Sequence, residues 1–145
     1  MARVRGCVFC DIVAGNTPAY TVYDDDLTTA FLDHAPLRPG HVLVLPKTHW
    51  PTLADLPRDS VGAFFEVVQR LSKAVEQAFR ADGSFVALNV KVSQSVPHLH
   101  AHVVPRHKGD GLFGRNFQWI RRPYPDAAAM REAQHAVRAA LSGAG

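Results

Sequence analysis

The chain has 145 residues, of which 47% are hydrophobic and 20% charged, with a formal net charge of +3. This size and composition predict a single domain, residues 1–145, with a buried core. The basic residues form no long cationic run, so an anionic small molecule suits the charge better than a nucleic acid. We also expect no membrane contact and a cytoplasmic location, because the sequence shows neither an 18-residue apolar run nor a signal-peptide pattern.

Short elements and turns alternate in the first third of the chain. Residues Cys7 to Ala14 favour a short helix. Thr21 to Tyr23 and Leu27 to Leu32 are β-prone, and the aspartates Asp24 to Asp26 between them predict a solvated hairpin turn rather than a metal site. The nearly continuous apolar run from His41 to Leu45 predicts a strand that is buried on both faces.

A long amphipathic helix dominates the middle of the chain. Apolar residues recur at three-and-four spacing from Asp59 or Ser60 to about Ala81, and Gly83 follows where a C-terminal cap is expected. One long helix among strands that come as hairpins predicts an α+β fold, an antiparallel sheet with helices on one side. The remaining predicted elements are strands Phe85 to Val90 and His98 to Val104, and a helix from Asp126 to about Leu141.

Three histidines occupy alternate positions near residue 100, namely His98, His100 and His102. In a strand they share one face, about 6.6 Å apart along the backbone, and the apolar residues between them share the other face. Random placement of eight histidines would produce such a triplet with an expectation of only about 0.02. Imidazole is a capable nucleophile near neutral pH, so this face is a candidate for phosphoryl chemistry. The intervening apolar residues are Leu99, Ala101 and Val103.

This segment resembles the His-x-His-x-His signature of the histidine triad (HIT) family of nucleotide hydrolases and transferases. The resemblance spans about residues 7–112 and leaves 113–145 as a C-terminal extension. It implies a five-stranded antiparallel sheet with one long central helix and a C-terminal helix, in a homodimer whose two sheets join. The matching stretches around the triplet are Pro39-Gly40-His41, Pro46 to His49, Gln94-Ser95-Val96, Pro105-Arg106 and Lys108-Gly109-Asp110.

The resemblance assigns catalytic roles within this signature. It implies that His100 attacks the α-phosphorus of a purine nucleoside phosphoramidate or dinucleoside polyphosphate and forms a nucleotidyl-histidine intermediate. His102 would bind phosphate or protonate the departing group, while Gln94 and Ser95 would hydrogen-bond phosphate oxygens. The middle histidine also has a histidine on either side, which agrees with its assignment as the nucleophile.

The nucleoside site is implied by the resemblance as well. Asp33 matches an acid that accepts hydrogen bonds from the ribose hydroxyls, and Phe31 would contact the base. The alternatives are a surface turn residue for Asp33 and ordinary core packing for the apolar residues. The other residues assigned to nucleotide binding are Phe9, Ile12, His34 and Asn89.

The chain departs from the family in one loop. The family commonly has a glycine-rich loop before the matching glutamine, whereas residues 90–93 are Val-Lys-Val-Ser. A stiffer loop changes what can approach the leaving-group side, so the choice between phosphoramidate and polyphosphate stays open. Several basic residues suit either a polyphosphate or a solvated loop: Arg106, Lys108, Arg115, Arg121 and Arg122.

The cysteine pair Cys7-x-x-Cys10 is ambiguous by itself. It fits two buried small residues, a redox motif or half of a metal site. The resemblance to bacterial zinc-containing members implies a structural Zn²⁺ bound by Cys7, Cys10, His49 and His98, a closed set of four ligands.

Two other functions and one further segment remain to be tested. A mononuclear zinc hydrolase would use two strand histidines at positions i and i+2 as metal ligands. A purine-nucleotide sensor would keep the pocket and turn over poorly.

Residues Gly111 to Trp119 combine glycines, an arginine and aromatics, which suits a mobile loop over an anionic, ring-bearing ligand. Burial of Phe117 and Trp119 at a dimer interface explains them equally well.

Overall fold

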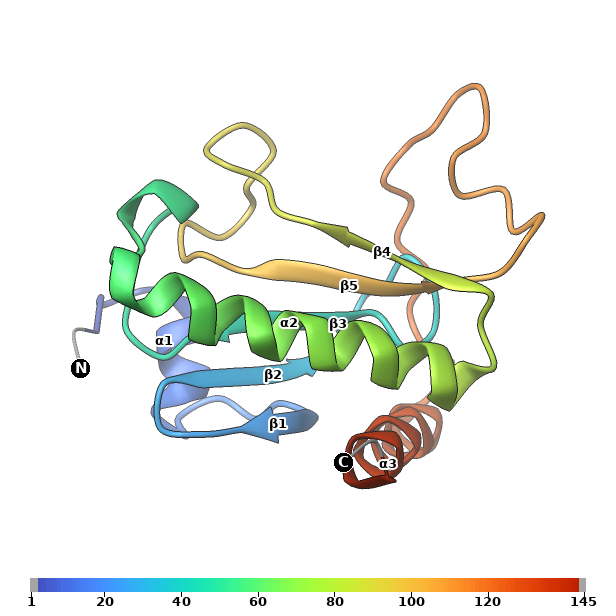
Figure 1. The fold of residues 1–145 in the computed structure, drawn as a ribbon, viewed down its shortest axis with the longest axis horizontal. Coiled ribbons are helices and arrows are strands. Elements are labelled where there is room, and N and C mark those ends of the chain that lie inside the picture. Colours follow the sequence, from blue (N-terminus) through green and yellow to red (C-terminus); the bar gives the residue numbers. More distant parts are fainter. Residues whose placement is uncertain (1–2, 144–145) are drawn as a thin grey trace.

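The structure is a computed structural model that describes residues 3–143. Its centre is a five-stranded antiparallel sheet in the order β1-β2-β3-β5-β4, with the long helix α2 lying across one face (Figure 1). The predicted α+β fold is therefore confirmed. The strands are β1 (Thr21–Asp24), β2 (Thr28–Leu32), β3 (Val42–Pro46), β4 (Gly83–Ala87) and β5 (Ala101–Arg106); the helices are α1 (Val8–Val13), α2 (Arg58–Phe79), α3 (Ala127–Gly143) and a 3-10 turn, Leu53–Asp55.

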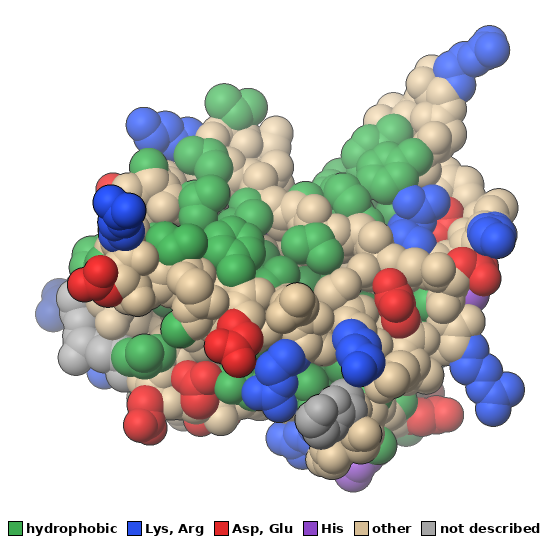
Figure 2. Space-filling view, viewed as in Figure 1, with side chains coloured by type: hydrophobic (Ala, Val, Ile, Leu, Met, Phe, Trp, Pro, Cys, Tyr) green, Lys and Arg blue, Asp and Glu red, His purple; other side chains and the backbone are tan. Residues whose placement is uncertain are grey.

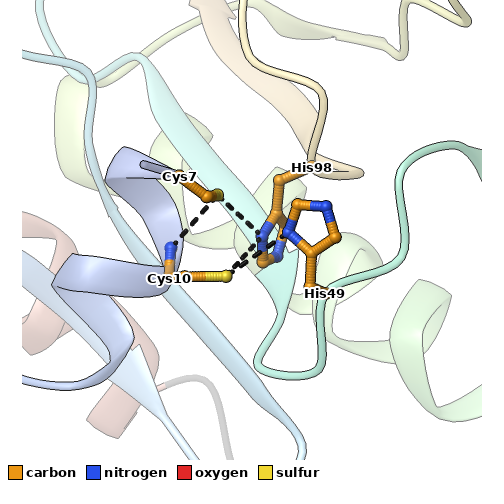
Figure 3. A group of neighbouring side chains, drawn as sticks. All are labelled: Cys7, Cys10, His49 and His98. Atoms are coloured by element: carbon orange, nitrogen blue, oxygen red, sulfur yellow. Dashed lines mark hydrogen bonds between the residues drawn. The ribbon is translucent and has the colours of Figure 1, made fainter. Parts of the chain in front are cut away.

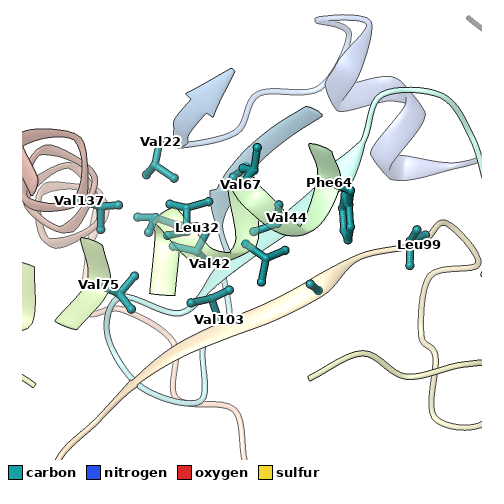
Figure 4. Close-up of a cluster of buried hydrophobic side chains, with 14 of the residues drawn as sticks. Val22, Leu32, Val42, Val44, Phe64, Val67, Val75, Leu99, Val103 and Val137 are labelled. Atoms are coloured by element: carbon teal, nitrogen blue, oxygen red, sulfur yellow. The ribbon is translucent and has the colours of Figure 1, made fainter. Parts of the chain in front are cut away.

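The centre of the sheet is buried on both faces, as the apolar run ending at Leu45 predicts. In β3, Val42 and Val44 join the cluster beneath α2, while Leu43 and Leu45 pack with residues of α1 on the opposite face. Figure 4 shows the first of these clusters between the sheet, α2 and α3. Because side chains alternate along a strand, a fully apolar strand needs cover on both sides, and the two helices supply it.

The two faces of strand β5 carry different kinds of residue. Ala101 and Val103, together with Leu99 just before the strand, belong to the cluster beneath α2, so His100 and His102 lie on the opposite face. The predicted strand from His98 is too long at its start, because β5 begins at Ala101. The backbone N–H of Leu99 instead donates to the carbonyl of Trp50 at 2.7 Å.

The prediction of Gly83 as the C-terminal cap of α2 is wrong. The helix ends at Phe79, and Arg80 takes the left-handed conformation with φ of 49° while its N–H donates to the carbonyls of Gln77 and Glu76. Gly83 already pairs with Arg106 in the sheet. Gly83 is part of β4 and does not cap the helix. The left-handed cap position is taken by Arg80, which is not a glycine, so nothing in the sequence indicated it.

The aspartate-rich turn between β1 and β2 is confirmed. Asp25 accepts hydrogen bonds from the backbone N–H groups of Leu27 and Thr28, both at 2.8 Å, and from the Tyr23 hydroxyl at 2.7 Å. These bonds satisfy the turn without a metal ion.

The C-terminal extension folds back onto the sheet. Helix α3 packs against α2 and β1, where its Ala133 and Val137 are buried.

Between residues 3 and 143 no helix is both long and apolar enough to cross a membrane, and the cytoplasmic location stays a prediction. Figure 2 shows hydrophobic side chains gathered in the upper part of the view. Exposed large hydrophobic residues include Val86 in β4, Val90 and Val92 in the loop after it, and Phe113.

Candidate active site and metal centre

One hydrogen bond shows which ring nitrogen of His100 carries the proton. Its Nδ1 lies 2.7 Å from the carbonyl oxygen of His98, which can only accept, so Nδ1 carries the proton. Nε2 therefore presents a lone pair. Burial lowers the pKa of His100, so this unprotonated state prevails at neutral pH.

His102 has the opposite tautomer, and His41 determines it. The N–H of Leu37 donates to Nδ1 of His41 at 3.0 Å, so in the neutral ring Nε2 of His41 bears the proton. That nitrogen lies 2.9 Å from Nδ1 of His102 and donates to it, which leaves the proton of His102 on its Nε2. Burial is the main reason why the pKa of His41 lies well below its usual range and that of His102 falls to about 3.

Sequence reasoning gave His41 no role. It precedes an entirely apolar strand, and its ring is fully buried. A histidine at the start of a buried strand was the available signal, but its partner lies 61 positions away in sequence. Only the pairing of β3 with β5 brings the two imidazoles together.

A cavity of about 200 Å³ opens beside His100; we call it the nucleoside pocket after the role that the sequence predicts for its residues. The ring of Phe9 packs edge-on against those of Phe31 and His100, with centroids 5.6 and 5.0 Å apart. Asp33 is buried at its rim, whereas the side chain of His34 is 90% exposed. Most of the residues assigned to nucleotide binding line this cavity together: Phe9, Ile12, Phe31, Asp33, His34 and Ser95.

Asp33 already has partners. Its Oδ1 accepts a hydrogen bond from the N–H of Ala35 at 2.9 Å. The Nη1 of Arg121 lies 3.3 Å from its Oδ2 and forms an ion pair with it. A residue of the C-terminal extension thus reaches the nucleoside pocket, a contact that the sequence pattern did not reveal.

A second cavity, of about 450 Å³, lies on the other side of His102. Asn89 lies in it, and Ser95, His102 and Arg121 line both cavities. Its remaining lining residues are Phe85, Ala87, Ser93, Phe117 and Trp119.

Gln94 lies outside the lining of both cavities in the described part of the chain. Its amide accepts from the N–H of Lys91 at 2.8 Å and donates to the carbonyl of Pro51 at 2.6 Å, so it fastens the glycine-free loop. Lys91 and Ser93 in that loop have φ of 66° and 61°. The loop therefore adopts left-handed conformations that normally favour glycine.

The four predicted metal ligands meet at the N-terminus of α1 (Figure 3). Nδ1 of His98 lies 3.5 Å from Sγ of Cys7 and 3.7 Å from Sγ of Cys10, and Nδ1 of His49 lies 3.3 Å from Sγ of Cys10. A sulfur and a nitrogen bound to one tetrahedral zinc ion are about 3.6 Å apart. The donor set and its spacing therefore fit a tetrahedral metal.

Of the two histidines in this cluster, His98 is also held in the tautomer that leaves Nδ1 free to bind a metal. Nε2 of His98 donates to the carbonyl of Pro46 at 2.8 Å, which directs the lone pair of Nδ1 at the thiols. Such a backbone partner is the usual support of a metal-binding imidazole.

The fold and the site define a class: an antiparallel α+β domain that places an imidazole with a free Nε2 lone pair beside an apolar pocket with a buried carboxylate. The family model described as HIT domain matches residues 14–109. The chain belongs to the histidine triad family.

Comparison with known proteins agrees with this. A crystal structure of a Zn-bound histidine triad family protein from Mycobacterium smegmatis matches with a TM-score of 0.83 and 39% identity, over 96% of this chain and 95% of that one. An adenylylsulfatase of Arabidopsis thaliana is 37% identical over 74% of this chain and 55% of its own length. A bis(5'-nucleosyl)-tetraphosphatase (asymmetrical) of Schizosaccharomyces pombe is 37% identical over 61% of this chain and 50% of its own.

Proposed function

We propose that this protein hydrolyses a purine nucleoside phosphoramidate or a dinucleoside polyphosphate at the α-phosphate, through a nucleotidyl intermediate on His100. The observation that carries the proposal is the pair of opposite tautomers, a lone pair on Nε2 of His100 and a proton on Nε2 of His102. The names of the two relatives, an adenylylsulfatase and a tetraphosphatase, support cleavage next to a nucleotidyl group.

The reaction has two balanced steps. Nε2 of His100 attacks the α-phosphorus, the bond from phosphorus to the leaving group breaks, and the leaving atom takes the electron pair. Where the leaving atom needs a proton, His102 passes one on through its Nε2 and regains one from water, so its imidazole is neutral before and after the step. Water then attacks the nucleotidyl-histidine, releases the nucleoside monophosphate and gives its spare proton to the solvent.

Nucleoside recognition falls to the pocket beside His100. The edges of Phe9 and Phe31 suit the faces of a purine, and Asp33 is a buried acceptor for ribose hydroxyls. Ser95 and Asn89 are donors close to the reacting phosphate. The chain thus recognises one nucleoside and carries out its chemistry at the neighbouring phosphorus.

The hydrogen bonds disfavour the mononuclear zinc hydrolase. Asp33, His41 and His102 do gather ligand atoms within 4.8 Å of one another. However, Nδ1 of His102 accepts the Nε2 proton of His41 at 2.9 Å, so His102 has no free lone pair, either for this group or for an i and i+2 pair with His100, unless a proton is removed. A sensor without turnover would have no use for a nucleophile and an acid in matched tautomers.

We also propose a structural zinc ion at the cluster formed by Cys7, Cys10, His49 and His98. Four protein ligands leave no open position, which is the pattern of a structural rather than a catalytic site. The zinc would tie α1 to the segments that carry His49 and His98. The Zn-bound Mycobacterium smegmatis neighbour supports this choice of metal.

A homodimer joined at β4 is part of the proposal. Strand β4 pairs only with β5 in the described chain, so its other edge is open. Exposed Val86 on the strand and Val90 and Val92 beyond it give that edge an apolar surface (Figure 2). Pairing of two such edges would cover the open backbone groups and the valines together.

Denaturing mass spectrometry tests the central claim. The protein is mixed with adenosine 5'-phosphoramidate, quenched at high pH and digested. We expect an adenylyl adduct on the peptide containing His100, which neither the zinc hydrolase nor the sensor would form. Turnover without any adduct on a rapid-quench timescale would refute the covalent route.

A further inference from the structure

The two cavities meet at the reacting centre. An α-phosphorus in reach of Nε2 of His100 has the nucleoside pocket on one side and the second cavity on the other, with His102 between them. If the nucleoside occupies the first, the leaving group must depart through the second. The composition of the second cavity therefore indicates which leaving groups suit it.

Arg121 is the cationic residue that lines both cavities in the described part of the chain. Its side chain is 42% exposed, and its contacts with Asp33 and with the carbonyl of Ala35, at 3.1 Å, all use Nη1. The N–H groups on Nε and Nη2 are thus available to a ligand. The backbone N–H of Arg122 donates to the carbonyl of Pro36 at 2.7 Å and anchors this segment beside the site.

The charge of Arg121 acts on the catalytic histidines. It contributes to the lowered pKa values of His100 and His102, after the larger effect of burial. By contrast, Arg106 is bound at 2.7 Å through Nε and Nη2 by both carboxylate oxygens of Asp110. Arg121 is accordingly the basic residue of the C-terminal half that is placed to meet negative charge at the phosphorus.

Aromatic rings form part of the wall of the second cavity. The ring of Trp119 lies 4.8 Å from that of His102 and 6.4 Å from that of Phe85, measured between centroids. Phe117, 40% exposed, lies at the outer part. Such a wall accepts a flat ring by stacking, whereas a small amine would leave it unfilled.

We propose that the second cavity is a leaving-group subsite in which Arg121 binds an anionic leaving group and Trp119 stacks on a ring that this group carries. The inference rests on the proposed function and narrows its substrate class. The preferred substrates are nucleotides joined through an anhydride to an acidic group, best of all one that ends in a second base.

The chemistry of the departing atom separates Arg121 from His102. When the bond from phosphorus to an anhydride oxygen breaks, the oxygen keeps the electron pair and is weakly basic, so it needs a neighbouring positive charge more than a proton. When a phosphoramidate bond breaks, the amine nitrogen must gain a proton, which reaches it through Nε2 of His102 and is replaced from water. Arg121 is therefore a specificity residue for anionic leaving groups.

Three substrates with the same adenosine half test this. Adenosine 5'-phosphoramidate has a neutral leaving group, adenylyl sulfate an anionic one without a ring, and diadenosine tetraphosphate an anionic one with a ring. Values of kcat/KM are measured for the wild type, Arg121→Gln, Arg121→Lys and Trp119→Ala. Arg122→Gln, which makes the same charge change one residue away, is the matched control.

We expect Arg121→Gln to lower the ratio of kcat/KM for either anionic substrate to that for the phosphoramidate by at least about tenfold, the size of one lost charge-assisted hydrogen bond. Arg121→Lys should recover part of the ratio, and Arg122→Gln should leave it unchanged. Trp119→Ala should lower the rate on diadenosine tetraphosphate relative to adenylyl sulfate. Any effect through Asp33 cancels in these ratios, because the adenosine half is common.

Equal losses on all three substrates in Arg121→Gln would overturn the inference and make the residue a support of Asp33 only. Equal losses in Trp119→Ala with dimer dissociation in sedimentation would assign that residue to an interface. Failure of the proposed function itself is distinguishable, because no adenylyl adduct would then form on His100 with the phosphoramidate in the wild type.

Discussion

The carbonyl oxygen of His98 accepts a 2.7 Å hydrogen bond from Nδ1 of His100, while the imidazole of His98 lies among the cysteines of the candidate metal centre. A single residue therefore belongs to both sites. Its side chain helps to fix the start of β5, and its backbone fixes the tautomer of His100, the proposed nucleophile. The candidate metal centre and His100 are therefore linked through the backbone carbonyl of His98.

Removing the metal should destabilise the fold more than it impairs the chemistry. We expect one zinc ion per chain by elemental analysis of the purified protein. A chelator should then lower the melting temperature by several degrees, because four ligands from separated segments are no longer held together. The rate of His100 adenylylation, measured below the new transition, should change much less.

Cys10→Ser is the matched variant for this experiment. It should lose the metal and show the lower melting temperature without a chelator. A metal-free protein of unchanged stability would contradict a structural role for the cluster.

Replacing His100 with Ala should separate binding from turnover. We expect hydrolysis to fall by three orders of magnitude or more, since the nucleophile is absent. Binding of AMP, followed by calorimetry, should stay within about tenfold, because Phe31 and Asp33 build the pocket. Near-normal turnover by His100→Ala would end the covalent mechanism.

His41 should act as a positioning residue through His102. In His41→Leu nothing donates to Nδ1 of His102, so its proton is no longer held on Nε2. Cleavage of the phosphoramidate, which needs that proton, should fall by about tenfold to a hundredfold more than cleavage of adenylyl sulfate. Steady-state kinetics on both substrates measure this, with His135→Leu on α3 as the control, and equal losses on both would assign His41 to packing alone.

The buried histidines should make the protein less stable in acid. The pKa of His102 is about 3 in the folded state, against about 6.5 in an unfolded chain. Below pH 6.5 the unfolded state therefore binds a proton that the folded state does not. The free energy of unfolding decreases as the pH is lowered, by up to about 1.4 kcal/mol per pH unit for this one group. Above pH 6.5 its contribution is constant.

Urea unfolding at pH 7.5 and pH 5.0 checks the sign and the source. The loss of stability between the two should be smaller in His102→Asn than in the wild type. His135→Asn, which changes an exposed histidine of α3, should behave as the wild type does. A stability that increases toward pH 5.0 would contradict the argument.

The loop between Asn89 and Gln94 should carry local strain. Ser93 has φ of 61°, a conformation that costs a residue with a side chain about 1–2 kcal/mol. Ser93→Gly should therefore raise the free energy of unfolding by a few tenths to about 1 kcal/mol, after the larger entropy of an unfolded glycine is subtracted. Val92→Gly, at an 81% exposed neighbour without positive φ, should lower it.

The sequence by itself determined the features that depend on local periodicity. The alternation of His98 to His102 with apolar residues predicted that the apolar residues face the core, and the cluster beneath α2 confirms it; the chemical role of the histidine face stays a prediction. The apolar run ending at Leu45 predicted a strand covered on both sides for the same reason. Side-chain direction along a strand or helix follows from spacing alone, so these predictions needed no tertiary contact.

Only the tertiary structure decided which distant groups meet. His41 reaches His102 through the pairing of β3 with β5, and Arg121 reaches Asp33 because the C-terminal segment returns to the pocket. Neither pair has a periodic signal, since their separations of 61 and 88 positions are fixed by how the chain closes on itself. The tautomer of His102, and with it the proposed direction of proton transfer, follows from the long-range hydrogen bond with His41, whereas the tautomer of His100 follows from a local bond to the carbonyl of His98.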